Sequence, residues 1–115
     1  MEPYRAIIPE LDADDEELIV QWGEENEGIV HDHAVEAAVS LHKTGSPGDF
    51  IVIIEFFTSK ADIIPFGDII VDYDEIEVVF DDAESYYVRT EEYEKAAKVK
   101  TIRESLNIKT KLYGK

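Results

Sequence analysis

FIVIIEFF, residues 50–57, decides the fold of this 115-residue chain. Seven of its eight side chains are apolar and β-branched or aromatic, a composition typical of a central strand. Alternate side chains of a strand point to opposite faces. This alternation predicts one face made of Phe50, Val52, Ile54 and Phe56, and another made of Ile51, Ile53, Glu55 and Phe57. A strand that is apolar on both faces belongs in a sheet that is covered on both sides.

Three further elements precede this strand. Residues 3–9 read as a first strand bracketed by prolines, which suit strand ends. The acids of residues 12–17 stand where a helix N-terminus favours them, and predict a helix over 14–22. The histidine-bearing stretch 29–44 predicts a second helix, which ends at Gly45.

The segment after the central strand suggests a hairpin. Residues 69–73 and 76–80 pair across a turn at 74–75 in a register that makes one face wholly apolar. Thr90 is the predicted N-cap of a last helix, and residues 108–113 alternate like a final strand.

This order of elements predicts an α+β fold. We expect a two-layer sandwich with a split-βαβ (ferredoxin-like) arrangement and an extra hairpin strand; an open α+β sandwich of another topology is the alternative. A chain of this length can bury one core. We therefore expect residues 1–115 to form a single acidic domain with a basic C-terminal helix and strand over 95–115.

The charge is strongly acidic, with 27 acids, 11 bases and a net charge of -16. Residues 95–115 nevertheless carry seven of the bases and a single acid, so the basic end is expected to neutralise part of the body. An acidic body repels phosphate backbones, which argues against nucleic-acid binding.

Composition excludes some chemistry. Cysteine is absent, so disulfides, thiolate nucleophiles and Cys-based zinc sites are excluded. No leader opens the sequence and the longest apolar run is too short to cross a bilayer, so we expect a cytoplasmic protein. The scarcity of Asn and Gln is typical of thermophilic proteins.

All three histidines lie between His31 and His42. On a helix, residues two apart point roughly 160° from each other, so His31 and His33 cannot bind one ion. Asp32, His33 and Glu36 form a candidate metal cluster. We favour ordinary helix histidines and expect no cofactor.

Glu55 is the candidate catalytic residue, because it is the one polar side chain in the central strand. If buried, its pKa would be raised and it could act as a general acid or base. The favoured alternative is a structural carboxylate that reaches water or a base such as Arg89.

The predicted hairpin also creates an acidic patch. It sets Asp72 against Glu77 and Asp68 against Asp81, and opposed like charges destabilise a sheet. A divalent cation could neutralise the patch, but lysines from the last strand, Lys109 and Lys111, or simple solvation are the favoured explanation.

These features favour a protein-interaction module without catalytic activity: an adaptor, inhibitor or antitoxin-like partner of a basic protein. The alternative is a small ligand-binding or enzymatic domain that uses Glu55 in a cleft. We also expect a homodimer, in which a second copy covers the apolar face made by Ile51, Ile53 and Phe57. The competing interpretation is that the helix over 14–22 covers that face within one chain.

Overall fold

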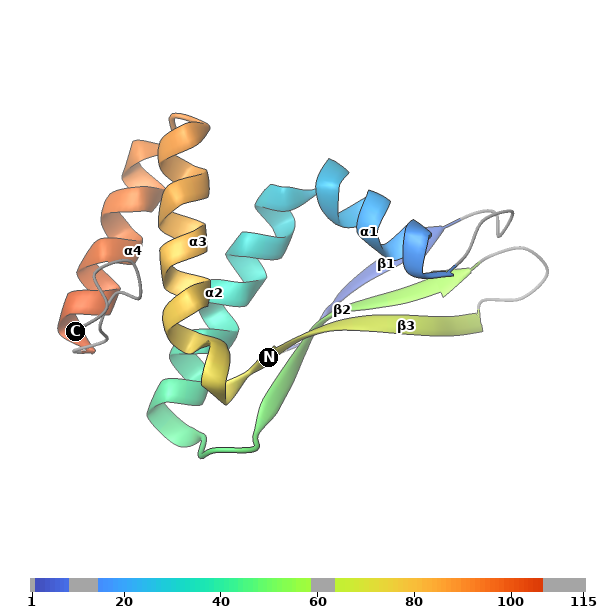
Figure 1. Cartoon of the computed structure of the whole chain (residues 1–115), viewed down its shortest axis with the longest axis horizontal. Helices are drawn as coiled ribbons and strands as arrows, with labels where there is room; N and C mark the ends of the chain where they lie inside the picture. Colours follow the sequence, from blue (N-terminus) through green and yellow to red (C-terminus); the bar gives the residue numbers. More distant parts are fainter. Residues whose placement is uncertain (1, 9–14, 59–63, 107–115) are drawn as a thin grey trace.

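The computed structural model describes residues 2–8, 15–58 and 64–106. The described chain is α+β, with helices packed against a three-stranded mixed sheet (Figure 1). Its elements in chain order are β1 (Tyr4–Ile8), α1 (Asp15–Glu25), α2 (Glu27–Thr44), β2 (Phe50–Thr58), β3 (Ile64–Asp72), the short 3₁₀ turn η1 (Tyr73–Glu75), α3 (Ile76–Arg89) and α4 (Tyr93–Ser105). The α+β class and the small sandwich are confirmed, whereas the split-βαβ arrangement is not.

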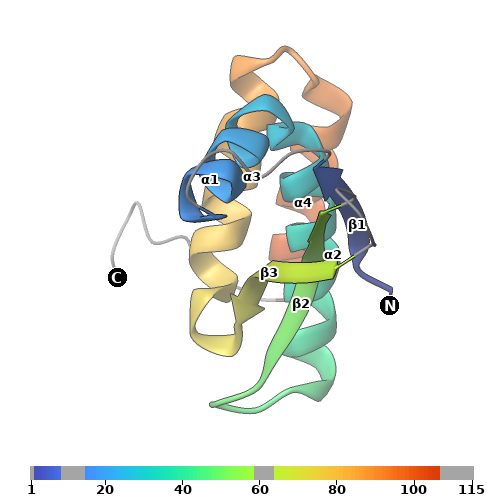
Figure 2. The same ribbon diagram turned by 90° about the vertical axis from the view of Figure 1, so that its right-hand side faces the viewer.

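The sheet has the order β1-β2-β3, so the apolar strand β2 is central, as its composition predicts. β1 runs parallel to β2, and the chain between them passes through α1 and α2. β3 runs antiparallel to β2. Viewed from the sheet end in Figure 2, α3 and α4 stand behind the strands.

A β-bulge changes which side chains of β2 share a face. The register steps from Val52 opposite Ile70 to Ile54 opposite Ile69, so Ile53 is an extra residue without a partner on β3. A bulge interrupts the alternation of side chains, and Ile53 and Ile54 are both buried. The two faces predicted from a regular strand are therefore wrong beyond this point.

The inner face of the sheet is covered by α1 and α2. The Trp22 ring of α1 packs edge-on against Phe56, with ring centroids 5.3 Å apart. Gly67 of β3 lies so close to α1 that an added Cβ would come within 2.6 Å of the Ile19 Cδ1. Apolar side chains from these elements, together with α3 and α4, form one core.

The other side of the sheet, which we call the open face, exposes apolar side chains. Its residues are Arg5 and Ile7 from β1, Phe50, Val52, Glu55 and Phe57 from β2, and Asp68 and Ile70 from β3. Ile7, Phe50 and Ile70 are 54%, 56% and 40% exposed. Such exposure shows that the described helices leave this face uncovered.

The predicted hairpin between residues 69–73 and 76–80 is wrong. Residues 69–72 do belong to a strand, β3, but it pairs with β2, and Ile76 begins the helix α3. The buried positions Ile76, Phe80, Ala83 and Tyr87 recur with helical spacing. A short β-branched run is compatible with a strand or a helix. Here the run is helical because the helix packs these four side chains against the core.

The helices α3 and α4 lie side by side and form a helical hairpin (Figures 1 and 2). Thr90 is the C-cap of α3, not the N-cap of α4, and its hydroxyl donates to the Tyr86 carbonyl oxygen at 2.9 Å. α4 begins at Tyr93, after Glu92. The strand predicted over 108–113 lies outside the described residues.

Candidate functional site

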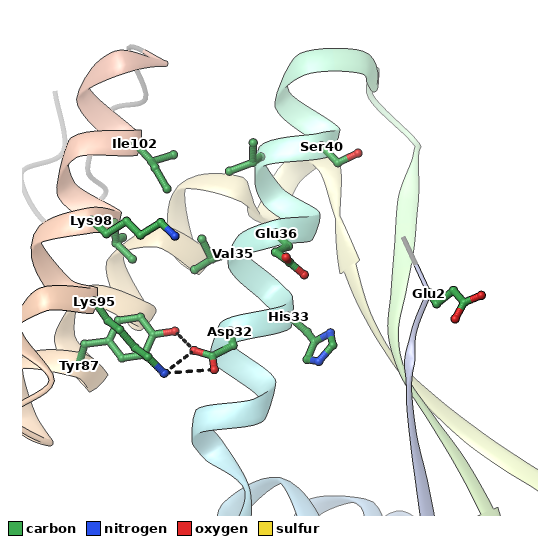
Figure 3. Close-up of a pocket in the computed structure, with 12 residues that line it drawn as sticks. Glu2, Asp32, His33, Val35, Glu36, Ser40, Tyr87, Lys95, Lys98 and Ile102 are labelled. Atoms are coloured by element: carbon green, nitrogen blue, oxygen red, sulfur yellow. Dashed lines mark hydrogen bonds and ion pairs between the residues drawn. The ribbon is translucent and has the colours of Figure 1, made fainter.

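An open depression of about 730 Å³ crosses α2 between α4 and the start of β1 (Figure 3). Its apolar lining consists of Val35, Val39, Val99 and Ile102. Lys95 and Lys98 contribute cations from α4, and Lys98 extends toward α2 in Figure 3.

Asp32 joins three helices at one end of this depression. Its carboxylate accepts a hydrogen bond from the Tyr87 hydroxyl of α3. It also forms an ion pair with Lys95 of α4, whose Nζ lies 3.3 Å from Oδ2. Lys95 in turn lies over the Tyr87 ring and pairs with Glu92. The cluster therefore fastens α2 to the α3–α4 hairpin.

The electrostatics of this cluster favour a structural role. Burial, reinforced by the hydrogen bond to Asp32, raises the pKa of Tyr87. The hydrogen bond to Asp32 is also the main cause that raises the pKa of Lys95. Both groups therefore keep their protons at neutral pH and act as donors, not as a phenolate or amine nucleophile.

The candidate metal cluster of Asp32, His33 and Glu36 is not assembled. In Figure 3, Asp32 turns toward Tyr87 and Lys95, whereas His33 points away from them, toward the strands. The rotation of about 100° per helical residue separates Asp32 from His33. Within the described residues, no three His, Asp or Glu side chains come together in a way that could hold a metal ion.

The three histidines have separate surroundings. His31 stacks on Tyr86 with ring centroids 4.6 Å apart, and burial lowers its pKa. His33 packs edge-on against Tyr4 at 5.8 Å. His42 is exposed in the last turn of α2. His31 and His33, which are expected to point in different directions from a helix, therefore contact different aromatic rings.

Glu55 lies on the open face, half-buried between its strand neighbours. It is in register with Arg5 on β1 and with Asp68 on β3. Glu55 lines neither the depression over α2 nor a smaller one that includes His31 and Arg89. Because all three histidines belong to α2, Glu55 has no histidine beside it on the sheet.

The acidic patch predicted for Asp68, Asp72, Glu77 and Asp81 is not one surface, because residues 76–80 are helical. Asp68 is exposed on the sheet, and Asp72 caps η1 in a reciprocal arrangement with Glu75. Asp81 is 7% exposed on α3. Lys109 and Lys111, which were expected to neutralise the patch, lie outside the described residues.

Arg103 of α4 is a partner of Asp81. The Arg103 Nη1 lies 2.7 Å from Asp81 Oδ1, and Nη2 lies 2.6 Å from Glu84 Oε2. The Arg103 side chain is 12% exposed, so this network is largely buried. It ties α4 to α3.

The predicted interface residues Ile51, Ile53 and Phe57 do not share one surface. Ile53 is 1% exposed, so the chain itself buries it. Ile51 packs against the core, while Phe57 lies on the open face beneath the Arg5 guanidinium, which is 5.6 Å from the ring centre. The bulge at Ile53 causes this division.

Sequence reasoning did not identify Tyr87, Lys95 or Arg103 as partners of the acids. Tyr87 and Lys95 lie 55 and 63 positions from Asp32. Arg103 lies 22 and 19 positions from Asp81 and Glu84. The helical spacing of Ile76, Phe80 and Tyr87 was the available signal, because it places α3 against the core.

Comparison with known proteins gives no relative. No protein-family model, no curated protein and no solved structure matches this chain. Among the described residues, no helix has both the length and the apolarity needed to cross a bilayer.

Proposed function

We propose that this chain is an acidic protein-interaction module without catalytic activity, which binds a basic protein as an adaptor, inhibitor or antitoxin-like partner. The observation that carries the proposal is the position of Glu55. It stands on the open face of the sheet beside Arg5 and Asp68, lines neither of the two depressions described above, and belongs to a different element from the histidines. The enzymatic alternative requires Glu55 in a cleft with a histidine partner, and therefore has less support.

The chemistry of the partner follows from α1. This helix contains five acids and no base, and in Figure 1 it lies over the sheet at the opposite end of the molecule from the basic helix α4. Glu17, Val20, Gln21 and Glu24 are all exposed. An exposed apolar residue within an acidic surface suits a partner with basic groups around an apolar contact.

Three cations of the other helices are paired with acids away from α1. Arg89 pairs with Glu27, Lys95 with Asp32, and Arg103 with Asp81, all within the α2–α4 part of the molecule. The field around α1 therefore remains negative and would steer a basic protein toward this end.

A pair of charge-reversed variants tests this proposal. The chain would be used to capture proteins from its source cells in three forms: wild type, Glu17→Lys/Glu24→Lys on α1, and Glu91→Lys/Glu94→Lys near the α3–α4 turn. The two variants change the net charge equally at exposed positions. We expect a basic protein that the wild type and the Glu91/Glu94 variant retain and the α1 variant loses.

The captured protein would then be purified and titrated against all three forms. Equal binding to the wild type and the α1 variant would contradict the assignment of α1. An acidic partner would contradict the proposed chemistry. Turnover of a small molecule that depends on Glu55 would support the enzymatic alternative instead.

A further inference from the structure

The open face of the sheet has an ordered pattern of charged and apolar rows. Arg5, Glu55 and Asp68 are in register across β1, β2 and β3, and form one charged row. On one side of this row lie Ile7 and Phe57, and on the other side lie Val52 and Ile70. A charged row thus runs between two apolar rows.

The charged row is unbalanced within one chain. Glu55 and Asp68 stand opposite each other on neighbouring strands, where like charges are unfavourable. Arg5 adjoins Glu55, but two strand spacings of about 4.8 Å separate it from Asp68. Among the described residues of this row, Asp68 therefore has a carboxylate as its neighbour and no cation beside it.

We infer that the open face binds a second copy of this chain about a twofold axis parallel to β2, with Arg5 of each copy facing the partner's Asp68. Such an axis keeps every row opposite the same row and exchanges β1 with β3. At both edges, charged residues then meet charged residues of opposite sign, and apolar rows meet apolar rows. At the centre, Glu55 meets the partner's Glu55, a like-charge contact that weakens the association. This inference goes beyond the proposed function, because it concerns another surface and another occupant.

The other in-plane axis is electrostatically unfavourable. A twofold axis along the charged row would place Arg5 over the partner's Arg5 and Asp68 over the partner's Asp68. Both axes keep the strands of the two sheets aligned, as face-to-face sheets prefer, and both place Glu55 opposite the partner's Glu55. The charges at the two edges therefore select the axis parallel to β2.

The size of the face predicts a weak dimer. β2 has nine residues, or about 30 Å of strand, and three strands are about 14 Å across. The projected area of about 400 Å² per copy is about half that of a stable complex. The negative charge of each copy opposes association further, so measurements need physiological salt and concentrations up to several hundred micromolar.

Charge-reversed variants and their mixture test the arrangement. In a dimer of the Arg5→Asp variant, an acid would face an acid at both edges. In a dimer of the Asp68→Arg variant, an arginine would face an arginine at both edges. Mixed in equal amounts, the two variants would form two complementary pairs. Sedimentation equilibrium should therefore show a 13.1 kDa species for each variant and a dimer for the wild type and for the mixture.

Two controls separate this contact from general charge effects. Lys43→Asp and Asp74→Arg make the same charge changes at exposed positions away from the open face, and should dimerise like the wild type. Circular dichroism confirms that each variant is folded, and Arg5→Glu or Asp68→Lys replaces a variant that is not.

A 13.1 kDa wild type at every concentration would overturn the inference. Undiminished association of Arg5→Asp alone, or a mixture no heavier than its components, would overturn it as well. None of these results touches the proposed basic partner, because that proposal is tested by variants of α1, which lies on the inner face.

Discussion

Replacing Arg103 with Met should destabilise the fold strongly. The substitution keeps most of the aliphatic side chain and removes the guanidinium that contacts Asp81 and Glu84 at 2.7 and 2.6 Å. Breaking a buried ion pair from one side costs about 3–5 kcal/mol. Because Glu84 is partly exposed, the lower value applies, and the free energy of unfolding should fall by about 3 kcal/mol.

This loss is large for a chain of 115 residues. It corresponds to a change of about 150-fold in the unfolding equilibrium constant and to a melting temperature about 12 °C lower. Urea titration followed by circular dichroism measures the free energy directly. Total stability of such a domain is typically about 5–15 kcal/mol, so the variant should remain folded without denaturant.

Arg89→Met is the matched control. It removes the same charge from an exposed pair with Glu27, in which the two side chains are 66% and 43% exposed. Exposed pairs contribute less than about 1 kcal/mol. In the Arg103→Met background, Asp81→Asn should recover about 2 kcal/mol because it removes the buried charge. Equal losses for Arg103→Met and Arg89→Met, or no recovery with Asp81→Asn, would refute the reasoning.

Three further predictions can be checked by urea titration. Tyr87→Phe should cost about 1 kcal/mol by removing the hydrogen bond to Asp32. Since the pKa of Tyr87 is raised above 10.0, the wild type should lose stability as the pH rises past that value, and the variant should lose less. The pKa of His31 is lowered from 6.5 by burial, so acidification below 6.5 should destabilise the wild type more than His31→Gln; parallel pH profiles would contradict this. Gly67→Ala should cost less than about 1 kcal/mol by overpacking, because the new Cβ would meet Ile19 Cδ1 at 2.6 Å and this end of the side chain can rotate away; a larger loss that Ile19→Val does not restore would contradict this.

The sequence predicted the elements whose signals are local. FIVIIEFF became the central strand β2, and the helix ending at Gly45 matches α2. The acids before Leu18 favour a helix N-terminus, and the glycine after Thr44 favours a helix C-terminus. Both effects reach no further than one helical turn. Such signals need no knowledge of the rest of the fold.

The errors arose where distant contacts decide. IEVVF at 76–80 has high β-propensity, yet the stripe of Ile76, Phe80 and Ala83 packs on the core as a helix. Nothing in FIVIIEFF marks Ile53 as the bulged residue, because its place depends on the register with β3. The predicted faces failed for that reason.

The candidate site was predictable only in part. Asp32 was selected from its neighbours in sequence, His33 and Glu36, but its contacts are with Tyr87 and Lys95. These residues come from two later helices, whose positions follow from the packing of α3 and α4. Residue type and spacing along one helix could not reveal them.

The parallel pairing of β1 with β2 has a consequence for the order of folding. Tyr4 pairs with Ile54, whereas β2 and β3 are joined by a short connection. Closing the longer loop costs more chain entropy and is slower. β1, with only five residues on one neighbour, should therefore dock last and detach first. Each detachment would expose an edge of β2, the most apolar strand. The tendency of the chain to aggregate edge to edge should therefore depend on the free energy that keeps β1 paired with β2.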